Sequence, residues 1–588
     1  MRLECKTTTR GWGAGKKRRG VLTCALAFAS GLIVCLVTAE PTRAQQLKRQ
    51  TSRASASQTA SAPSTSVQAL KEIAGLLQAG RLAEAEALAR QTVESSPRDS
   101  QAHTLLGVVL DQLGRLDEAE REYREALRLD SRNASAHANL GVLLVRTNHP
   151  DGAVEEFETT LRLAPGHTQA TYNLAVLYCA RGDFKPAVPL LENAAGVRAG
   201  TPTRANNDPS LMLMLVKAYL LGGQTEEGKR LAAAIESAGA DDPRVLFSLG
   251  LVLAEAHDYN AAARIFQRRD ALSPNTFEVL YNLGVALYNI DRLEEAASAL
   301  ERAAALKPSD AETLYRLGLV ASARKQSELA LGLWQKALEL RPEFPEANFM
   351  IAEELFKHER FQTAIPFYKL AVEQSPDTLV YYIRYGAAHF RRKRYEEARA
   401  VYEQAVKRFP NVPQLHYLVG YAARGEGDYD KASAAFHRAL ELDPNNADAI
   451  ANLGYLASER GDTDEAEKLL RRAISLNSKL YPPHYDLGRL LVRLKRYDEG
   501  IQVLQSTAAM NATDPGVHYQ LFIALSRLKR KEEAQRELEV FQRLESVRKT
   551  RQRSEDAKES QSSEETALPD PTVTLPSESP ERKPVRTP

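Results

Sequence analysis

The chain is poor in cysteine and tryptophan and has no excess of charge of either sign. Its 588 residues include four cysteines and two tryptophans, and 78 basic residues stand against 76 acidic ones, a formal net charge of +2. A charge this close to zero lacks the basic footprint of nucleic-acid-binding proteins, so we expect no nucleic-acid partner. The hydrophobic share of 43% and the charged share of 26% are those of a folded globular protein.

The few cysteines are unevenly distributed. Cys5, Cys24 and Cys35 lie in residues 1–44, and only Cys179 lies beyond them. If residues 1–44 are removed on export, one thiol remains and no disulfide framework can form within the chain. The stability of the mature protein must then come from packing.

Residues 1–44 have the composition of a secretory signal peptide. A basic stretch, Lys16–Gly20, precedes the apolar run Val21–Val37, and small residues suited to cleavage follow. We therefore expect an exported protein, periplasmic or secreted. The alternative is that residues 21–37 remain as an anchor in the cytoplasmic membrane, although this run is shorter than the ~20 residues of an ordinary span. Membrane contact is expected only through this segment, if it is not cleaved.

Two further segments have the composition of disordered chain. Residues 45–66 are rich in Ser, Thr, Ala and Gln, and residues 549–588 are rich in Ser, Glu, Pro and Lys. Such segments cannot bury enough apolar surface to offset chain entropy. We predict a disordered linker at 45–66 and a disordered tail at 549–588.

Between these ends the sequence repeats itself with a step of 34 residues. Each unit has a glycine, an alanine twelve residues later, and an aromatic residue or leucine four residues after the alanine, and proline closes most units. The structural repeat positions are Gly107 and Ala119, Gly141 and Ala153, Gly284 and Ala296, Gly318 and Ala330, Gly386 and Ala398, Gly420 and Ala432, and Gly454 and Ala466.

This pattern predicts a pair of packed helices in each unit. Apolar residues recur at helical spacing in two stretches, with a short polar turn between them. Glycine inside a helix costs about 1 kcal/mol relative to alanine, so its recurrence requires a packing reason. We expect the glycine and the alanine to let the two helices approach closely, the aromatic residue to fill the space beside them, and proline to end the second helix.

The period and the order of small, small, aromatic and proline residues resemble the tetratricopeptide repeat family. The resemblance covers residues 67–548 and implies an all-α fold, an α-solenoid superhelix of about fourteen repeats between two disordered tails. Repeats 1–4 are expected at 67–199, and repeats 5–14, with a C-terminal cap helix, at 209–548. Residues 200–208 interrupt the period. We interpret them as an inserted surface loop, with a hinge as the alternative.

Sequence signatures of catalysis are lacking. The chain has no phosphate-binding loop, no H-E-x-x-H motif and no G-x-S-x-G elbow. Histidines recur four residues before the glycine position, one to a repeat, too far apart to share a metal, and we interpret them as packing residues. We therefore expect a non-enzyme without metal or cofactor.

The candidate partner-binding residues precede the repeated glycine by three or two positions. In this family the first helix of each repeat lines the concave groove, where rings supply contact area and amides pair with a peptide backbone. The candidates are the aromatic residues Tyr172, Phe247, Tyr281, Tyr315, Phe349, Tyr417 and Tyr485 and the asparagines Asn139, Asn173, Asn282 and Asn452. The asparagines resemble an interrupted form of the ladder that holds peptide main chain in O-linked N-acetylglucosamine transferases. The alternative is that they are consensus residues without a binding role.

The resemblance implies a non-catalytic scaffold that binds partner proteins through its concave face. Together with the predicted leader, it favours a role in the cell envelope. The alternative is an adaptor that binds extended peptide segments and recruits substrates to an enzyme on a separate chain. Because fold alone does not set function, the partners and the oligomeric state stay open.

Overall fold

The computed structural model describes residues 65–203, 208–238 and 242–562. It divides into two compact units, unit 1 up to Leu306 and unit 2 from Lys307, and each is considered by itself. The predicted signal peptide or anchor, most of the predicted linker and residues 563–588 of the predicted tail lie outside the described residues.

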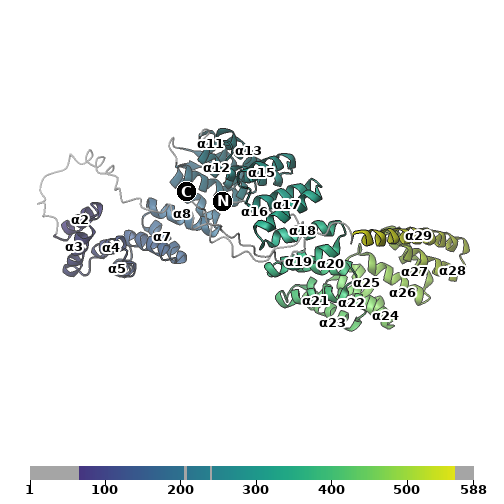
Figure 1. Ribbon diagram of the computed structural model, residues 1–588. Coiled ribbons are helices and arrows are strands. Elements are labelled where there is room, and N and C mark those ends of the chain that lie inside the picture. Colours follow the sequence, from purple (N-terminus) through teal and green to yellow (C-terminus); the bar gives the residue numbers. More distant parts are fainter. Residues whose placement is uncertain (1–64, 204–207, 239–241, 563–588) are drawn as a thin grey trace, which may run out of the picture. The chain divides into compact units, whose positions relative to one another are not determined.

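The described residues of unit 1 form seven helix pairs (Figure 1). Within each pair the first and second helices pack together, and each second helix also contacts the first helix of the next pair. The pairs are α2 Thr65–Gln78 and α3 Leu82–Ser95; α4 Ser100–Gln112 and α5 Leu116–Leu129; α6 Ala134–Arg146 and α7 Pro150–Leu163; α8 Thr168–Arg181 and α9 Phe184–Ala195; α10 Pro209–Leu221 and α11 Thr225–Ala238; α12 Pro243–Glu255 and α13 Tyr259–Leu272; and α14 Phe277–Asn289 and α15 Leu293–Leu306.

Residues 307–562 of unit 2 form seven further pairs with the same packing. They are α16 Ala311–Ala323 and α17 Ser327–Leu340; α18 Pro345–Lys357 and α19 Phe361–Gln374; α20 Leu379–Arg391 and α21 Tyr395–Arg408; α22 Pro413–Glu426 and α23 Tyr429–Leu442; α24 Ala447–Arg460 and α25 Thr463–Leu476; α26 Tyr481–Arg493 and α27 Tyr497–Met510; and α28 Pro515–Arg527 and α29 Lys531–Ser562. The predicted all-α solenoid of fourteen repeats is confirmed.

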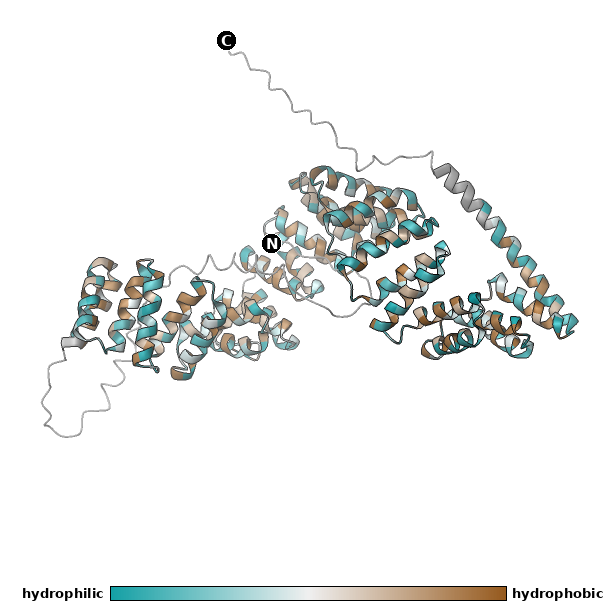
Figure 2. Ribbon diagram, turned by 90° about the horizontal axis from the view of Figure 1, so that it is seen from below, coloured by the Kyte–Doolittle hydropathy of each residue, from teal (hydrophilic) through white to brown (hydrophobic). Residues whose placement is uncertain are grey.

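The helices are amphipathic, and their apolar sides form the interior of each unit. Hydrophobic and hydrophilic residues lie side by side along the helices in Figure 2. In α5, for example, the buried residues are Ala119, Tyr123 and Ala126, which share one side of the helix. Burial of these stripes between neighbouring helices drives the stacking.

The repeated glycine lies directly against the ring of its own second helix. A Cβ atom on Gly107 would lie 2.6 Å from Tyr123 Cε1, and one on Gly141 would lie 2.7 Å from Phe157 Cε1. In unit 2, a Cβ atom on Gly420 would lie 2.8 Å from Phe436 Cδ1 and 3.0 Å from the backbone oxygen of Ala432. The glycine therefore makes room for the ring at least as much as for the partner backbone.

Repeat 5 inverts this arrangement. Val216 stands at the glycine position, Gly228 at the alanine position and Ala232 at the position of the ring. Val216 is fully buried, and a Cβ atom on Gly228 would lie 2.7 Å from Leu220 Cδ2. In repeat 5 the larger side chain is therefore on the first helix, α10, and the small residues are on the second helix, α11.

The segment expected to be a surface loop is partly ordered as a hairpin. Strands β1, Val197–Arg198, and β2, Thr201–Pro202, pair antiparallel, and the turn between them contains Ala199 and Gly200 at positive φ. Gly200 packs against the backbone of Glu227 in α11, so that a side chain there would collide. The first part of the insertion thus bridges repeats 4 and 5.

The last helix is longer than the sequence analysis predicted. It spans 32 residues and continues through residues 549–562, the beginning of the expected disordered tail. Its high content of Glu, Lys, Arg and Gln gives it strong helix propensity, which outweighs the lack of apolar residues at its end. Among the described helices, none is both long and apolar enough to span a membrane.

Candidate functional site

The four predicted asparagines have unequal exposure, although they share one register. Asn139 and Asn173, in unit 1, are half-buried. The side chain of Asn282 is fully buried, and its Nδ2 donates to the backbone oxygen of Glu278 at 2.7 Å. Asn452 is buried and donates to the backbone oxygen of Asp448 at 2.8 Å. In this conformation only Asn139 and Asn173 offer substantial amide surface to a ligand.

The predicted aromatic residues divide in a similar way. Tyr172 is 36% exposed, whereas Tyr281 and Tyr315 are buried. The other four are half-buried and pack against neighbouring rings: Phe247 against Phe266, Phe349 against Tyr381, Tyr417 against Phe436 and Tyr485 against Tyr481. Much of their area therefore stabilises the repeats.

A second set of side chains, which sequence reasoning missed, lies on the first helices of repeats 10–13. We call it the aromatic–arginine face and define it by Phe390 of α20, Tyr421 and Arg424 of α22, Tyr455 of α24 and Arg489 of α26. Phe390 and Tyr421 are stacked with ring centroids 4.8 Å apart. Helix α24 contacts both α22 and α26, so these side chains form one continuous surface of half-buried groups.

Arg424 occupies the centre of this face. Its guanidinium carbon lies 4.8 Å from the ring centroid of Tyr421 and 5.1 Å from that of Tyr455, within the range of cation–π attraction. Its Nη1 donates to Oδ1 of Asn452. Among the residues that the structure describes, no carboxylate lies within ion-pair distance of Arg424.

Arg489, at the neighbouring end of the face, is neutralised. Its Nη2 lies 2.8 Å from Glu459 Oε1 and 3.7 Å from Asp486 Oδ1, and its guanidinium carbon lies 5.5 Å from the ring centroid of Tyr455. Burial raises the pKa of Asp486 to about 6, although the charges of Arg489 and Arg424 act against the rise.

Arginine and aromatic groups also join repeats 9 and 10. Arg384 of α20 donates two hydrogen bonds to Glu353 of α18, at 2.6 and 2.7 Å, and lies over the ring of Phe356 at 4.5 Å. Tyr368 also donates to Glu353. This bidentate pair satisfies both charges within the protein.

The sequence contained a signal for the aromatic–arginine face. Tyr421, Tyr455 and Arg489 each follow the repeated glycine by one residue, and Arg424 follows it by four. These positions lie on the same side of the first helix as the predicted aromatic position, because residues four and seven apart share a helix face. The prediction considered only the residues before the glycine.

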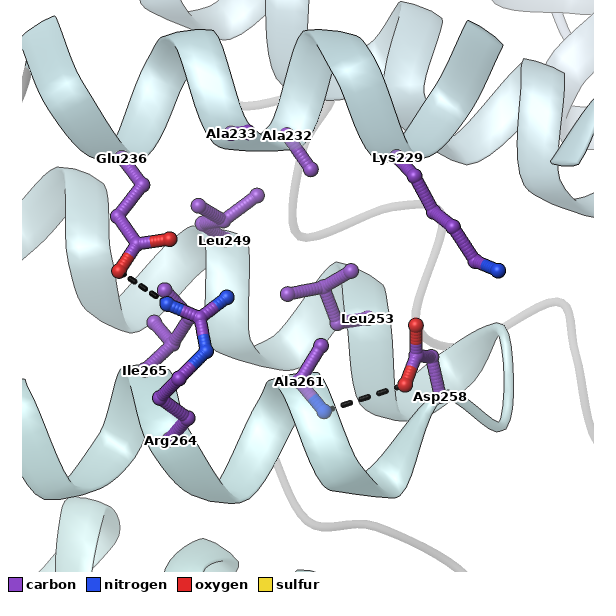
Figure 3. Close-up of a pocket in the computed structure, with 10 residues that line it drawn as sticks. All are labelled: Lys229, Ala232, Ala233, Glu236, Leu249, Leu253, Asp258, Ala261, Arg264 and Ile265. Carbon is purple, nitrogen blue, oxygen red and sulfur yellow. Dashed lines mark hydrogen bonds and ion pairs between the residues drawn. The ribbon is translucent and has the colours of Figure 1, made fainter. Parts of the chain in front are cut away.

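A groove lies between the second helix of repeat 5, α11, and the two helices of repeat 6, α12 and α13 (Figure 3). It has a volume of about 240 Å³, and α11, α12 and α13 supply its walls, with Ala232, Leu249, Leu253 and Ile265 among its apolar lining. Glu236 and Arg264 pair at one end, and this hydrogen bond holds the pKa of Glu236 below its ordinary value. The alanine at the ring position of repeat 5 contributes to the opening.

One cluster of Ser, His and Glu invites comparison with catalytic machinery. Ser327 Oγ lies 2.8 Å from His358 Nε2 and donates to Glu354, which also accepts from Ser322. In a nucleophilic triad the serine proton is directed to histidine, whereas here it is directed to the carboxylate. Burial acts to raise the pKa of Glu354, but hydrogen bonds from Ser327 and Ser322 lower it overall. We interpret the cluster as a link between α17 and α18.

The recurring histidines act as hydrogen-bonded links as well as packing residues. His103 is hydrogen-bonded through both ring nitrogens, with Nδ1 2.7 Å from Glu122 Oε2 and Nε2 3.2 Å from the backbone oxygen of Pro97. His137 makes the equivalent contacts, to Glu156 and to the backbone oxygen of Ser131. His518 contacts Glu537 at the corresponding position of its repeat. No cluster of three or more potential metal ligands occurs in the described part of the chain.

The helix pairs and their ring–glycine contacts agree with the comparison with known families. Tetratricopeptide repeat models match residues 71–134, 138–202 and 277–310, and the model of the cilia and flagella-associated protein 70 C-terminal domain matches residues 325–566. The chain belongs to the tetratricopeptide repeat proteins, as its sequence pattern predicted. No match was found among the curated proteins.

Several solved structures resemble the chain. The C-terminal part of a tetratricopeptide-repeat protein from Cytophaga hutchinsonii is 15% identical, with 41% of this chain and 99% of that chain covered and a TM-score of 0.38. The structure of Naa15/Naa10 bound to HypK-THB is 17% identical, with 82% and 76% covered and a TM-score of 0.34. Yeast Tom70 is 17% identical, with 79% and 99% covered and a TM-score of 0.29.

Proposed function

We propose that the chain is a non-catalytic scaffold that binds partner proteins, and that the aromatic–arginine face of unit 2 is its main binding surface. The observation that carries this proposal is Arg424, a half-buried cation that lies near two tyrosine rings without a carboxylate partner in the described residues. Tyrosine and arginine are the residues that most often dominate the energetics of protein interfaces.

The architecture of the family supports a protein as the partner. Stacked repeats present extended surfaces built from the same face of successive helices. The aromatic–arginine face extends over α20, α22, α24 and α26, which suits an extended segment or a helix better than a small molecule. Its half-buried side chains are aromatic rings and guanidinium groups, which are suited to protein surfaces.

We place this scaffold in the cell envelope. The support is the leader-like sequence of residues 1–44, with its basic stretch, apolar run and small residues. Cleavage of the leader would release a periplasmic or secreted protein, and retention of residues 21–37 would hold the repeats at the membrane. N-terminal sequencing of the exported protein distinguishes the two.

The second candidate is a peptide-binding adaptor for an enzyme on a separate chain. The observation that favours it is the exposure of Tyr172 beside the half-buried Asn139 and Asn173 in repeats 3 and 4. An exposed ring beside two amides is suited to weak binding of peptide main chain. Its ligand would contact unit 1.

The test is affinity capture from envelope extract with the full chain. Wild type is compared with a Tyr421→Ala/Tyr455→Ala variant and with an Asn139→Ala/Asn173→Ala variant, each checked for an unchanged circular dichroism spectrum. A stoichiometric partner lost only with the tyrosine variant supports the scaffold. A partner lost only with the asparagine variant favours the adaptor, and equal capture by all three forms contradicts both surfaces.

A further inference from the structure

Arg424 is the arginine of the aromatic–arginine face that forms no ion pair with a carboxylate of the described residues. One of its N–H groups donates to Asn452, and its remaining donors have no other hydrogen bond to the residues that the structure describes. A guanidinium has five N–H donors in a planar fork that matches a carboxylate. Several of these donors are thus available to a ligand.

The side chain of Arg424 is held in place before any ligand arrives. The rings of Tyr421 and Tyr455 lie 4.8 and 5.1 Å from its guanidinium carbon. Asn452, which accepts its hydrogen bond, is itself fixed by donation to the backbone of Asp448. Little side-chain entropy remains to be lost on binding, and this preorganisation favours affinity.

Three other arginines of the region are paired with carboxylates. Arg384 is paired bidentately with Glu353, and Arg489 is paired with Glu459 at 2.8 Å. Arg399 is bonded to Glu426 and Glu403, both at 2.7 Å. Arg424 differs from these arginines because its side-chain partner is the amide of Asn452 and not a carboxylate.

We propose that Arg424 is a docking point for the side-chain carboxylate of an aspartate or glutamate in an extended segment of a partner protein. The inference rests on the proposed function and adds the chemistry of the partner. The carboxylate completes an ion pair with the guanidinium fork, while the neighbouring side chains of the segment lie against the rings of Tyr421 and Tyr455.

The surroundings limit the site to one carboxylate. Asp448 and Asp486 lie on α24 and α26 beside the face, and Glu459 already occupies Arg489. Like charges within a few ångströms repel strongly in a partly desolvated site. A segment with isolated acidic residues between uncharged ones therefore fits better than an acidic run.

The experiment measures binding of two synthetic probes to the full chain by fluorescence anisotropy. One probe is a labelled peptide with glutamate alternating with serine and with both ends blocked, and the other has glutamine in place of glutamate. A third, the glutamine peptide with a free C-terminal carboxylate, distinguishes a side-chain carboxylate from a chain terminus. Low ionic strength keeps the charge interaction unscreened.

We expect the glutamate peptide to bind at least about tenfold more tightly than the blocked glutamine peptide, a preference worth ~1.4 kcal/mol. Arg424→Gln should abolish this preference, and Arg424→Lys, which keeps the charge without the planar fork, should retain part of it. The matched control is Arg438→Gln. It removes the same charge from α23, the second helix of the same repeat, where Arg438 pairs with Glu441, and it should leave binding unchanged.

Three results would overturn the docking point. They are equal affinity for the two blocked peptides, an Arg424→Gln variant that keeps the preference within twofold, and a free C-terminal peptide that binds as tightly as the glutamate peptide. If the docking point fails while the tyrosine-dependent partner is still captured, the scaffold function stands without it. If capture is also unaffected by the tyrosine variant, the proposed binding surface fails as well.

Discussion

The two units are built on the same interior contact but present different first-helix faces. In both, a repeated glycine lies against a ring or leucine of the second helix. In unit 1, successive first helices are linked by direct ion pairs such as Arg146–Asp111 and Lys217–Glu255. In unit 2, direct ion pairs such as Arg384–Glu353 also link them, and in addition arginines lie over aromatic rings, as at Arg424. The interior contact sets the fold, while the face positions vary between the units.

The largest expected effect concerns a buried carboxylate of the unit 2 face. Burial raises the pKa of Asp486 to about 6, whereas the charges of Arg489 and Arg424 lower it and that of Glu459 raises it further. Because the folded state holds this proton more tightly than the unfolded state, the contribution of Asp486 to stability is greatest below pH 4 and is lost as pH rises through 6.

Asp486→Asn removes this ionisation. We expect the variant to be more stable than wild type by up to about 2–3 kcal/mol at pH 7.5, and close to wild type at pH 4. Urea denaturation at the two pH values measures the difference. Glu236→Gln is the comparison in unit 1, where the hydrogen bond from Arg264 holds the pKa of Glu236 below its ordinary value, so the stability of this variant should fall at pH 7.5. A parallel response of the two variants would contradict the opposite directions of the two pKa shifts.

The shared interior can be tested with glycine substitutions in both units. A Cβ atom on Gly141 would lie 2.7 Å from Phe157, and one on Gly454 would lie 2.9 Å from Leu470. We expect Gly141→Leu and Gly454→Leu each to cost about 1–3 kcal/mol through overpacking. Hydrogen exchange read by mass spectrometry localises the loss to the substituted repeat.

The matched control for these substitutions is Gly332, in the second helix α17. A Cβ atom there would meet nothing within 4 Å. Gly332→Ala should therefore stabilise the protein by up to about 1 kcal/mol, the helix-propensity difference. A gain in stability from Gly141→Leu or Gly454→Leu as well would show that the glycines are not required by packing.

The third prediction concerns repeat 5, where unit 1 departs from the common interior. Val216→Gly alone should leave a cavity, and Ala232→Phe alone should overpack α11 against α10. Together they restore the common glycine–ring pair, so the double variant should be more stable than the sum of the single effects by about 1–2 kcal/mol. Additive effects in denaturation would mean that the two residues do not compensate for each other.

The sequence predicted the helix pairs because their determinants are local. Glycine, alanine and ring lie within sixteen residues of one another, at spacings that the helix period turns into contacts. The contacts of the aromatic–arginine face instead join different repeats. Arg424 and Asn452 are separated by 28 residues, and their meeting depends on how consecutive pairs are rotated. No pattern within a single repeat encodes that rotation.

Register alone also failed to predict accessibility. Asn139 and Asn282 occupy the same position of the repeat, yet Asn139 is half-buried and Asn282 is fully buried. The difference arises from the surroundings, since Phe277 and Tyr281 stack in the same helix as Asn282, whereas Ala138 stands where Tyr281 does. Exposure of a face position depends on the bulk of its neighbours, which the repeat pattern leaves free.

The smallest expected effect tests whether the insertion in unit 1 acts as a hinge. Tyr219 of α10 is buried, donates to Glu192 of α9 and accepts from the backbone N–H of Gly200 at 3.1 Å. Tyr219→Phe should cost about 1 kcal/mol and increase hydrogen exchange in residues 197–202.

Tyr178→Phe is the control for this substitution, because Tyr178 also donates to a glutamate, Glu158, but is only half-buried and belongs to α8. It should leave exchange in the hairpin unchanged. If Tyr219→Phe also leaves that exchange unchanged, the hairpin does not depend on this contact. The alternative interpretation of the insertion as a hinge is then favoured. Faster exchange confined to the Tyr219 variant would mean that the hairpin fastens repeat 4 to repeat 5, so that the insertion stiffens the interior of unit 1 where the repeat period breaks.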